Sequence, residues 1–420
     1  MTATVTATST VPGPVDIVCL GESMVTFVPT APGRLADVPS FVRGIGGAES
    51  NVACGLAASG HRAKWIGRVG ADGFGEHLVA AIASYGVDTS AVQRDPHRPT
   101  GIYFRTAGER ATGTAGEEPD RAEVVYYRAG SAASAMSPST MRYEDLFSGR
   151  ILHLSGITAA LSAGCLSLMR TLTTRFPGRP LVSFDVNYRV NLWHDAADPR
   201  VLMDLARGSD IVFVGEDEAE AAWGVRGAAA IRAELPEPEV LVVKRGARGA
   251  VAYARGEAQV PCPRHPEPEA PAPDPPPTPC GCGGTSSPTP CGCGGTPSAS
   301  NAGGADLPAR PAADTVTEEP APRVDVVAPV GAGDAFAAGF LSATLRGLRA
   351  NERLRYGHLM AAATLTVAGD LAVPPARAYA DRLVALDARA WGRLRLGPGW
   401  TATAEQHPQG TQDPQEVRIP

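Results

Sequence analysis

The chain has 420 residues, 44% of them hydrophobic, and a formal net charge of −6 at pH 7. This length suits one large α/β domain, and an acidic chain without a basic stripe is unsuited to binding nucleic acid. No apolar run approaches the roughly 20 residues of a membrane span. Residues 1–14 lack the basic start and apolar centre of a signal peptide. We therefore expect a cytoplasmic protein with a disordered tail over 1–14 and neither a membrane nor a nucleic-acid partner.

The N-terminal part predicts short strands around glycine-rich turns. Apolar runs at 15–20 and 24–28 indicate two strands, and residues 52–59 follow a helical pattern. Gly46 and Gly47 precede that helix, where the lack of a Cβ lets a ligand approach the backbone closely. A plain loop-to-helix turn explains the same glycines equally well, so this segment alone leaves the presence of a binding site open.

Residues 102–105 and 124–128 alternate in polarity, as the two strands of a hairpin do. The polar side chains that share a face within each strand are Tyr103 with Arg105 and Tyr126 with Arg128. Hydroxyl and guanidinium groups on one face suit a hydroxylated, anionic ligand, although an edge strand with solvated arginines shows the same pattern. We interpret the hairpin as a flap over a site.

From residue 150 the pattern becomes a regular alternation of strands and helices. The expected strands, at 151–154, 181–185, 211–214 and 240–243, are continuous apolar runs, as in strands buried on both faces. This predicts a doubly wound, mainly parallel sheet with ligands at the carboxyl ends of its strands. The residues that follow those strands are polar or glycine: Asn187, Arg189, Gly215, Glu218, Lys244, Gly246 and Gly249.

Between residues 259 and 321 the composition shifts to Pro, Gly, Ala, Ser and Thr, which cannot bury a core. An eleven-residue unit that starts at Thr278 recurs from Thr289, and its C-x-C pairs lack the usual zinc spacing. We expect a disordered insertion that loops out of the fold.

The stretch around residue 334 is the strongest chemical signal. Residues 324–327 suggest a buried strand, Gly331 and Gly333 a tight turn, and residues from 335 onward a helix. The amides of the glycine turn can converge on an anion at the helix N-terminus, and Asp334, kept ionised there, can accept a hydroxyl proton. A turn with an aspartate that only caps the helix is the competing interpretation. Further helices are expected near 359–367 and 377–391, with a polar tail over 399–420.

With these motifs in this order, the chain resembles the ribokinase-like (PfkB) carbohydrate kinases. The two stretches that carry the resemblance are GGAESN at 46–51 and GAGDAF at 331–336. Within the family the chain is most similar to 2-keto-3-deoxygluconate kinases, on YYR at 126–128, SGIT at 155–158 and DVNYR at 185–189. The resemblance implies a single ribokinase-like domain over 15–258 and 322–398, with a small β lid from roughly 24–45 and 100–129.

The resemblance also implies ATP-dependent phosphorylation of the primary hydroxyl of a sugar acid, with Mg²⁺ as cofactor. It leaves open whether a monovalent cation assists. It makes Asp334 the base, and Gly331, Ala332 and Gly333 the anion hole. The implied substrate-binding residues are Gly46, Gly47, Asn51, Tyr103, Tyr126, Arg128, Arg189 and Asp370. The implied nucleotide-binding residues are Asn187, Lys244, Gly246 and Gly249, and Glu218 is an indirect metal residue.

The chain departs from the family pattern at two places. Ala328 and Pro329 stand where the family usually has Asp-Thr, and Gly215 stands where many members have Asn. The sequence therefore keeps two alternatives: a kinase for a neutral sugar or nucleoside such as fructose or ribose, and a non-catalytic sugar-binding regulator. It leaves the oligomeric state open, a homo-oligomer included.

Overall fold

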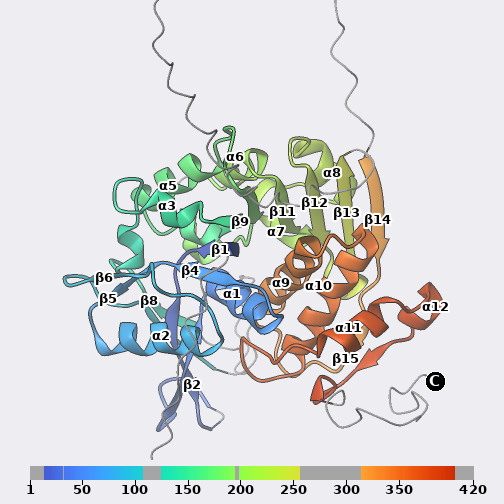
Figure 1. Ribbon diagram of the computed structural model, residues 1–420. Coiled ribbons are helices and arrows are strands. Elements are labelled where there is room, and N and C mark those ends of the chain that lie inside the picture. Colours follow the sequence, from blue (N-terminus) through green and yellow to red (C-terminus); the bar gives the residue numbers. More distant parts are fainter. Residues whose placement is uncertain (1–13, 32, 107–123, 194–197, 256–313, 403–420) are drawn as a thin grey trace, which may run out of the picture.

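The computed structural model describes residues 14–31, 33–106, 124–193, 198–255 and 314–402 (Figure 1). An eight-stranded sheet forms its centre, in the order β14-β13-β12-β11-β10-β9-β1-β4. The strands from β12 to β4 pair in parallel, and β13 and β14 are antiparallel at one edge. The bounds are β1 Val15–Leu20, β4 Ala63–Ile66, β9 Gly149–Ser155, β10 Leu181–Asp185, β11 Ile211–Gly215, β12 Val240–Lys244, β13 Ala250–Arg255 and β14 Asp314–Glu319.

Helices cover both faces of this sheet, so the predicted doubly wound architecture is confirmed (Figure 1). Alternate residues of β11 enter different cores: Val212 and Val214 join the cluster under α5 and α6, whereas Ile211 and Phe213 join the one under α1 and α9. The α-helices are α1 Ala48–Ala58, α2 Gly73–Ser84, α3 Tyr143–Leu146, α4 Gly156–Ala159, α5 Ala163–Thr173, α6 Arg200–Gly208, α7 Glu216–Trp223, α8 Ala228–Glu234, α9 Ala332–Leu345, α10 Ala350–Leu365, α11 Arg377–Val384 and α12 Ala388–Trp391.

Small residues let α9 pack closely against its neighbours. A Cβ on Gly339 would lie 2.4 Å from the carbonyl oxygen of Tyr356 on α10, and a Cβ on Gly55 of α1 would lie 3.1 Å from Ala338. Phe213 on β11 contacts the ring of Phe340 edge-on, with centroids 5.3 Å apart. The N-terminus of α9 is therefore held in a fixed place relative to α1 and to the sheet.

A four-stranded sheet, in the order β3-β2-β7-β8, projects from the body (Figure 1). One face carries a cluster of aromatic rings, with Phe27 stacked on Phe104 at 4.8 Å. The other face carries Tyr103 and Tyr126, which pair across β7 and β8. This arrangement matches the predicted lid. Its strands are β2 Met24–Pro29, β3 Phe41–Gly46, β7 Ile102–Arg105 and β8 Val124–Tyr127.

Three short 3₁₀ turns and two small sheets complete the described residues. The 3₁₀ turns are η1 Ala133–Ala135, η2 Val190–Leu192 and η3 Gly246–Arg248. The small sheets pair β5 Arg68–Gly70 with β6 Gln93–Asp95 and β15 Arg323–Val324 with β16 Arg395–Leu396. No helix within the described ranges is long and apolar enough to cross a bilayer.

The structure corrects several predicted boundaries. β14 lies inside the range predicted as insertion, because the β-branched run Thr315–Val316–Thr317 pairs with β13 along its length. The predicted strand 324–327 ends at Val324, and Val327 is half-exposed. The domain also continues past residue 398, since Trp400 is buried in the C-terminal core cluster. The predicted cysteine repeat lies outside the described residues.

Candidate active site

The predicted anion hole lies where the chain enters α9, which begins at Ala332, three residues earlier than expected. Gly331 has a left-handed φ of +73°, and a Cβ there would lie 2.5 Å from the carbonyl oxygen of Asp370. A glycine is required at this turn for both reasons. Ala332 and Gly333 form the first turn of the helix, whose amide groups have no acceptor within the helix and favour an anion.

Asp334 is the first acidic residue of α9 and is hydrogen-bonded across the site. Asn51 on α1 donates from Nδ2 to Oδ2 of Asp334 at 2.9 Å, which joins the two sequence motifs in space. Burial raises the pKa of Asp334 to about 7, and Asp185 adds to this effect against the hydrogen bond from Asn51. The expectation of an ordinary ionised carboxylate is therefore corrected. A carboxyl group with a pKa near neutrality is suited to accepting a proton.

Lys244 at the end of β12 faces the same turn. Its ammonium group donates to both oxygens of Asp185, at 3.0 and 2.9 Å. Burial alone would lower the pKa of Lys244, but the charges of Asp185 and Glu218 outweigh it and raise that pKa. A Cβ on Gly333 would lie 3.6 Å from Nζ. Glycine at this position therefore keeps a side chain away from the fixed cation beside the first turn of α9.

Asn187 follows β10 with a φ of +40°, which is rare for a residue other than glycine. Its side chain is buried, and its Oδ1 atom has no hydrogen-bond partner among the described residues. A strained backbone that aims an unpaired polar atom inward is typical of a ligand-binding position. The predicted contact of Asn187 with a nucleotide stays a prediction.

Glu218 and Arg189 lie near this group of charges. The carboxylate of Glu218 accepts the N–H of Gly215 at 2.7 Å, so Gly215 forms the start of α7. Burial raises the pKa of Glu218, against the charge of Lys244. Arg189 is exposed, and its charge lowers the pKa of both Glu218 and Asp334. Arg189 is thus close enough to act on the predicted base.

Gly246 and Gly249 form the turn between β12 and β13, with φ values of +59° and +108°. A Cβ on Gly249 would lie 2.2 Å from the carbonyl oxygen of Glu319, so packing against the end of β14 already requires a glycine there. The predicted contact of these two glycines with a nucleotide stays a prediction.

The inner face of the lid meets the loop after α10 at Asp370. Tyr103 donates from its hydroxyl to Oδ2 of Asp370 at 3.0 Å, and a Cβ on Gly46 would lie 2.4 Å from that hydroxyl. Arg105 pairs with Oδ1 of Asp370 at 2.7 Å, with both side chains buried. The sequence places Arg105 on the face of Tyr103, among polar groups that suit an anionic ligand, but Arg105 is not one of the predicted substrate-binding residues. The alternation of Arg105 with Phe104 along the strand was the sequence feature that indicated an inward-facing side chain.

Arg128 does not stand alone at the end of β8. It forms a buried ion pair with Glu22, which also accepts a hydrogen bond of 2.7 Å from Ser131. Tyr126 lies between the two groups, its ring 5.3 Å from that of Tyr103 and 5.7 Å from the guanidinium carbon of Arg128. Sequence reasoning missed Glu22, because a single acid in a turn gives no pattern.

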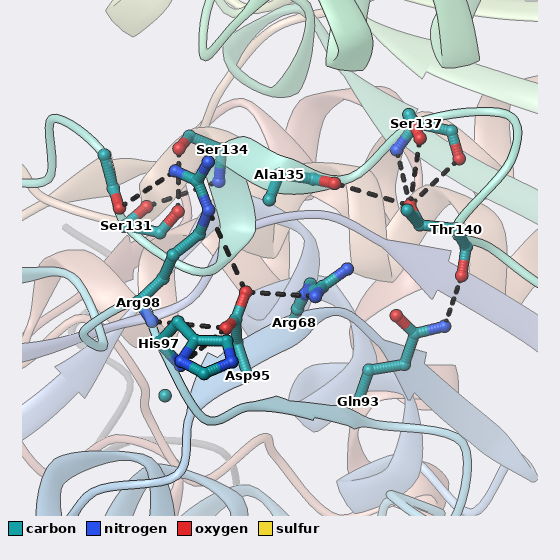
Figure 2. A network of polar contacts seen from close by, with 12 residues as sticks. Arg68, Gln93, Asp95, His97, Arg98, Ser131, Ser134, Ala135, Ser137 and Thr140 are labelled. Atoms are coloured by element: carbon teal, nitrogen blue, oxygen red, sulfur yellow. Dashed lines mark hydrogen bonds and ion pairs between the residues drawn. The ribbon is translucent and has the colours of Figure 1, made fainter.

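Gly47 packs against the same turn, since a Cβ there would lie 2.5 Å from the carbonyl oxygen of Glu22. A network beside it, shown in Figure 2, places Asp95 between Arg68, at 3.0 Å, and Arg98. Ser131 of this network reaches Glu22. The segment that precedes the lid strand β7 therefore supports the ion pair of Glu22 with Arg128.

Comparisons with known proteins show which family and fold this chain resembles. A solved PfkB protein from Polaromonas sp. JS666 is 30% identical and superposes with a TM-score of 0.63, over 87% of this chain and 99% of that one. Two solved structures show the same fold at lower identity. They are a 2-dehydro-3-deoxygluconokinase from Thermotoga maritima (22%, TM-score 0.63, 89% and 99% covered) and a sugar kinase from Pyrococcus horikoshii in complex with ATP (21%, TM-score 0.62, 90% and 99% covered).

Among curated proteins, 2-dehydro-3-deoxygluconokinase from Thermoproteus tenax is 33% identical over 58% of this chain and 73% of its own length. The enzyme of that name from Bacillus subtilis is 36% identical over 50% of this chain and 63% of its own length. Fructokinase-1 from rice is 30% identical over 57% and 73%. The family model for pfkB family carbohydrate kinases matches residues 15–270 and 309–377. The chain therefore belongs to the pfkB family of carbohydrate kinases.

Proposed function

We propose that this kinase transfers the γ-phosphoryl group of ATP to the primary hydroxyl of a sugar acid, 2-keto-3-deoxygluconate. One observation carries the reaction. Asp334, hydrogen-bonded to Asn51, stands in the first turn of α9, and the ammonium group of Lys244 lies 3.6 Å from where a Cβ on Gly333 would be. Phosphoryl transfer requires a held phosphate and a nearby proton acceptor, and this group of residues provides both.

On the donor side, Lys244 and the amides of Gly331, Ala332 and Gly333 neutralise the phosphate. The unpaired Oδ1 of Asn187 is available to a polar group of the nucleotide. Asp185 and Glu218 are the carboxylates that would hold Mg²⁺ through water, an arrangement that suits an ion which keeps several waters and binds phosphates directly. When bound, that ion would offset the negative charge of the phosphate oxygens.

On the acceptor side, Asp334 takes the proton of the attacking hydroxyl. The sugar oxygen forms its bond to the γ-phosphorus as the bond from that phosphorus to the β–γ bridging oxygen breaks, and ADP leaves. Asn51 holds the carboxyl group in position through its hydrogen bond of 2.9 Å. The pKa of about 7 leaves a useful fraction of Asp334 able to accept a proton at neutral pH.

The choice of a sugar acid rests on the arginines and on the relatives. Arg128 at the lid and Arg189 after β10 supply cationic groups, and Tyr103 and Asp370 supply polar ones. Two of the relatives described above carry the name 2-dehydro-3-deoxygluconokinase. Because Glu22 already pairs with Arg128, we propose that Arg128 binds the substrate carboxylate with the nitrogen atoms that Glu22 does not occupy.

A neutral hexose is the second candidate, favoured by the 30% identity to rice fructokinase-1 and by the internal pairing of both lid arginines. The test is an ADP-release screen over sugar acids, neutral sugars and nucleosides, with and without Mg²⁺. We expect the sugar acid to exceed fructose by at least about tenfold in kcat/KM, since only the acid offers a charged partner to the nitrogen atoms of Arg128 that Glu22 does not occupy. A higher kcat/KM for fructose would make the neutral hexose the assigned substrate. Sugar binding without ADP formation would favour a non-catalytic regulator.

A further inference from the structure

Glu49 joins two stretches that carried the family resemblance, yet the proposed reaction does not use it. It lies in the first turn of α1 and is fully buried. Its Oε1 atom accepts hydrogen bonds from Ser155 at 2.8 Å and from Thr158 at 2.7 Å. These two hydroxyls stand at the end of β9 and in α4, so one carboxyl group links the start of α1 to the carboxyl edge of the sheet.

The fold makes room for this carboxyl group. A Cβ on Gly21, directly after β1, would lie 2.0 Å from Cδ of Glu49. No lysine or arginine of the described residues forms an ion pair with Glu49, and its Oε2 atom has no hydrogen-bond partner there. A buried carboxyl group without a cation does not stabilise a fold as well as an apolar side chain of the same size. This arrangement therefore suits a role in the reaction.

The position of Glu49 relates it to the base. Asn51 lies two residues further along α1 and donates to Asp334, so whatever fixes the first turn of α1 also fixes that hydrogen bond. Gly47, the residue before α1, lies at the turn that holds Glu22. We propose that Glu49, held by Ser155 and Thr158, is a positioning residue that sets the first turn of α1 and thereby the orientation of Asp334. The proposal rests on phosphoryl transfer with Asp334 as base.

Electrostatics agree with this geometry. The titratable groups that face Glu49 are the Asp334 carboxyl on α9 and the Cys19 thiol on β1, while β9 and α4 contribute the two hydroxyls. Burial raises the pKa of Glu49 to about 7, the hydroxyls oppose it, and the charge of Asp334 adds to it. Repulsion between two charges is reciprocal, so an ionised Glu49 disfavours the ionised Asp334, but burial, Asn51 and Asp185 contribute more to the pKa of Asp334.

The test compares Glu49→Ala and Glu49→Gln in the full chain by steady-state kinetics between pH 5.5 and 9. We expect Glu49→Ala to lower kcat/KM for the sugar by at least about tenfold and to leave the KM for ATP within about twofold, because misplacing a reacting group is costly. Glu49→Gln keeps an acceptor for the two hydroxyls but no charge. We expect it to stay within about threefold of the wild type at pH 8 and to move the acid limb of kcat/KM to lower pH.

Two further comparisons separate positioning from folding. Thr158→Val removes one hydrogen-bond donor to Glu49, and Thr158→Ser keeps it. We expect Thr158→Val to lower kcat/KM for the sugar and Thr158→Ser to keep the wild-type value. This pair tests the proposal even if Glu49→Ala does not fold. Asp210→Asn alters a buried carboxylate held by Arg175 and Arg179 before β11, and it should lower Tm without moving the acid limb. Wild-type kcat/KM in Glu49→Ala, or a loss in Glu49→Gln as large as that in Glu49→Ala, would overturn the proposal. Undiminished ADP release by Asp334→Asn would instead overturn the proposed reaction.

Discussion

The donor side and the acceptor side of the site are built differently. On the donor side, one pair, Lys244 with Asp185, is fixed by the ends of parallel strands and faces a helix N-terminus. On the acceptor side, two pairs, Arg105 with Asp370 and Arg128 with Glu22, connect the lid strands to loops of the body. The donor side is therefore part of the rigid sheet, whereas the acceptor side depends on contacts that lid strands make.

This difference separates chemistry from selectivity. The amides of α9 are set by backbone geometry that few substitutions can alter, and the Lys244 ammonium is held by Asp185 at the end of a parallel strand. The lid pairs consist of side chains alone, so single substitutions at Glu22, Arg105 or Arg128 can change the charge that a sugar meets. Changes on the donor side should alter turnover for every sugar, and changes in the lid should alter the order of preference among sugars.

Apart from the predicted base itself, the largest effect is expected at Lys244. Lys244→Met removes the cation from the phosphate side and leaves Asp185 buried without its partner. We expect kcat/KM for ATP to fall by about 100-fold or more, and unfolding to become easier by about 3–5 kcal/mol, as when a buried pair loses one member. Arg245→Met, one residue further on the same turn, should change neither by much. An unchanged kcat/KM in Lys244→Met would exclude this lysine from phosphate binding.

The pH dependence should report the buried carboxyl groups at and beside the predicted base. Because the pKa of Asp334 is raised to about 7, kcat/KM should fall about tenfold per pH unit below that value. The folded state binds more protons at Asp334 and Glu49 than the unfolded state between about pH 4 and 7, so these groups favour folding as the pH falls through that window. Lost activity at pH 6 without a lower Tm is the expected result. A parallel loss of Tm would attribute the acid limb to unfolding.

A smaller and selective effect is expected at Arg128. Arg128→Gln should lower kcat/KM for the sugar acid by about tenfold or more and change that for its uncharged analogue much less, since only the former loses a charge partner. Arg98→Gln, in the neighbouring network of Figure 2, is the matched control and should leave the ratio unchanged. An equal fall for both sugars would mean that Arg128 supports the lid and does not select the substrate.

The smallest effect is expected from the predicted insertion. Arg255 at the end of β13 pairs with Asp314 at the start of β14, so a short turn can connect the two strands in place of the predicted insertion. Deleting residues 263–309 should leave kcat and KM within about twofold. Deleting 263–320 removes β14 as well, exposes a sheet edge and should lower Tm. Kinetic loss in the shorter deletion would assign the segment a role in the reaction.

Much of the fold could be predicted, because continuous apolar strands and glycine-rich turns are local signals. Residues 181–185 matched β10, and the two motifs met through Asn51 and Asp334. The internal pairing of Arg128 with Glu22 could not be predicted, since it depends on residues far apart in sequence and on burial. The raised pKa of Asp334 was missed for the same reason: the helix N-terminus is visible in the sequence, and the depth of burial is not.

The most direct test of the account is Asp334→Asn, measured by calorimetry for sugar binding and by ADP release in the same preparation. The amide keeps the shape of the side chain but cannot take a proton. We predict sugar affinity within about threefold of the wild type and ADP release lowered by about 1,000-fold, within the range for a lost general base. ADP release near the wild-type rate would contradict the account, because the proton of the attacking hydroxyl would then leave by another route.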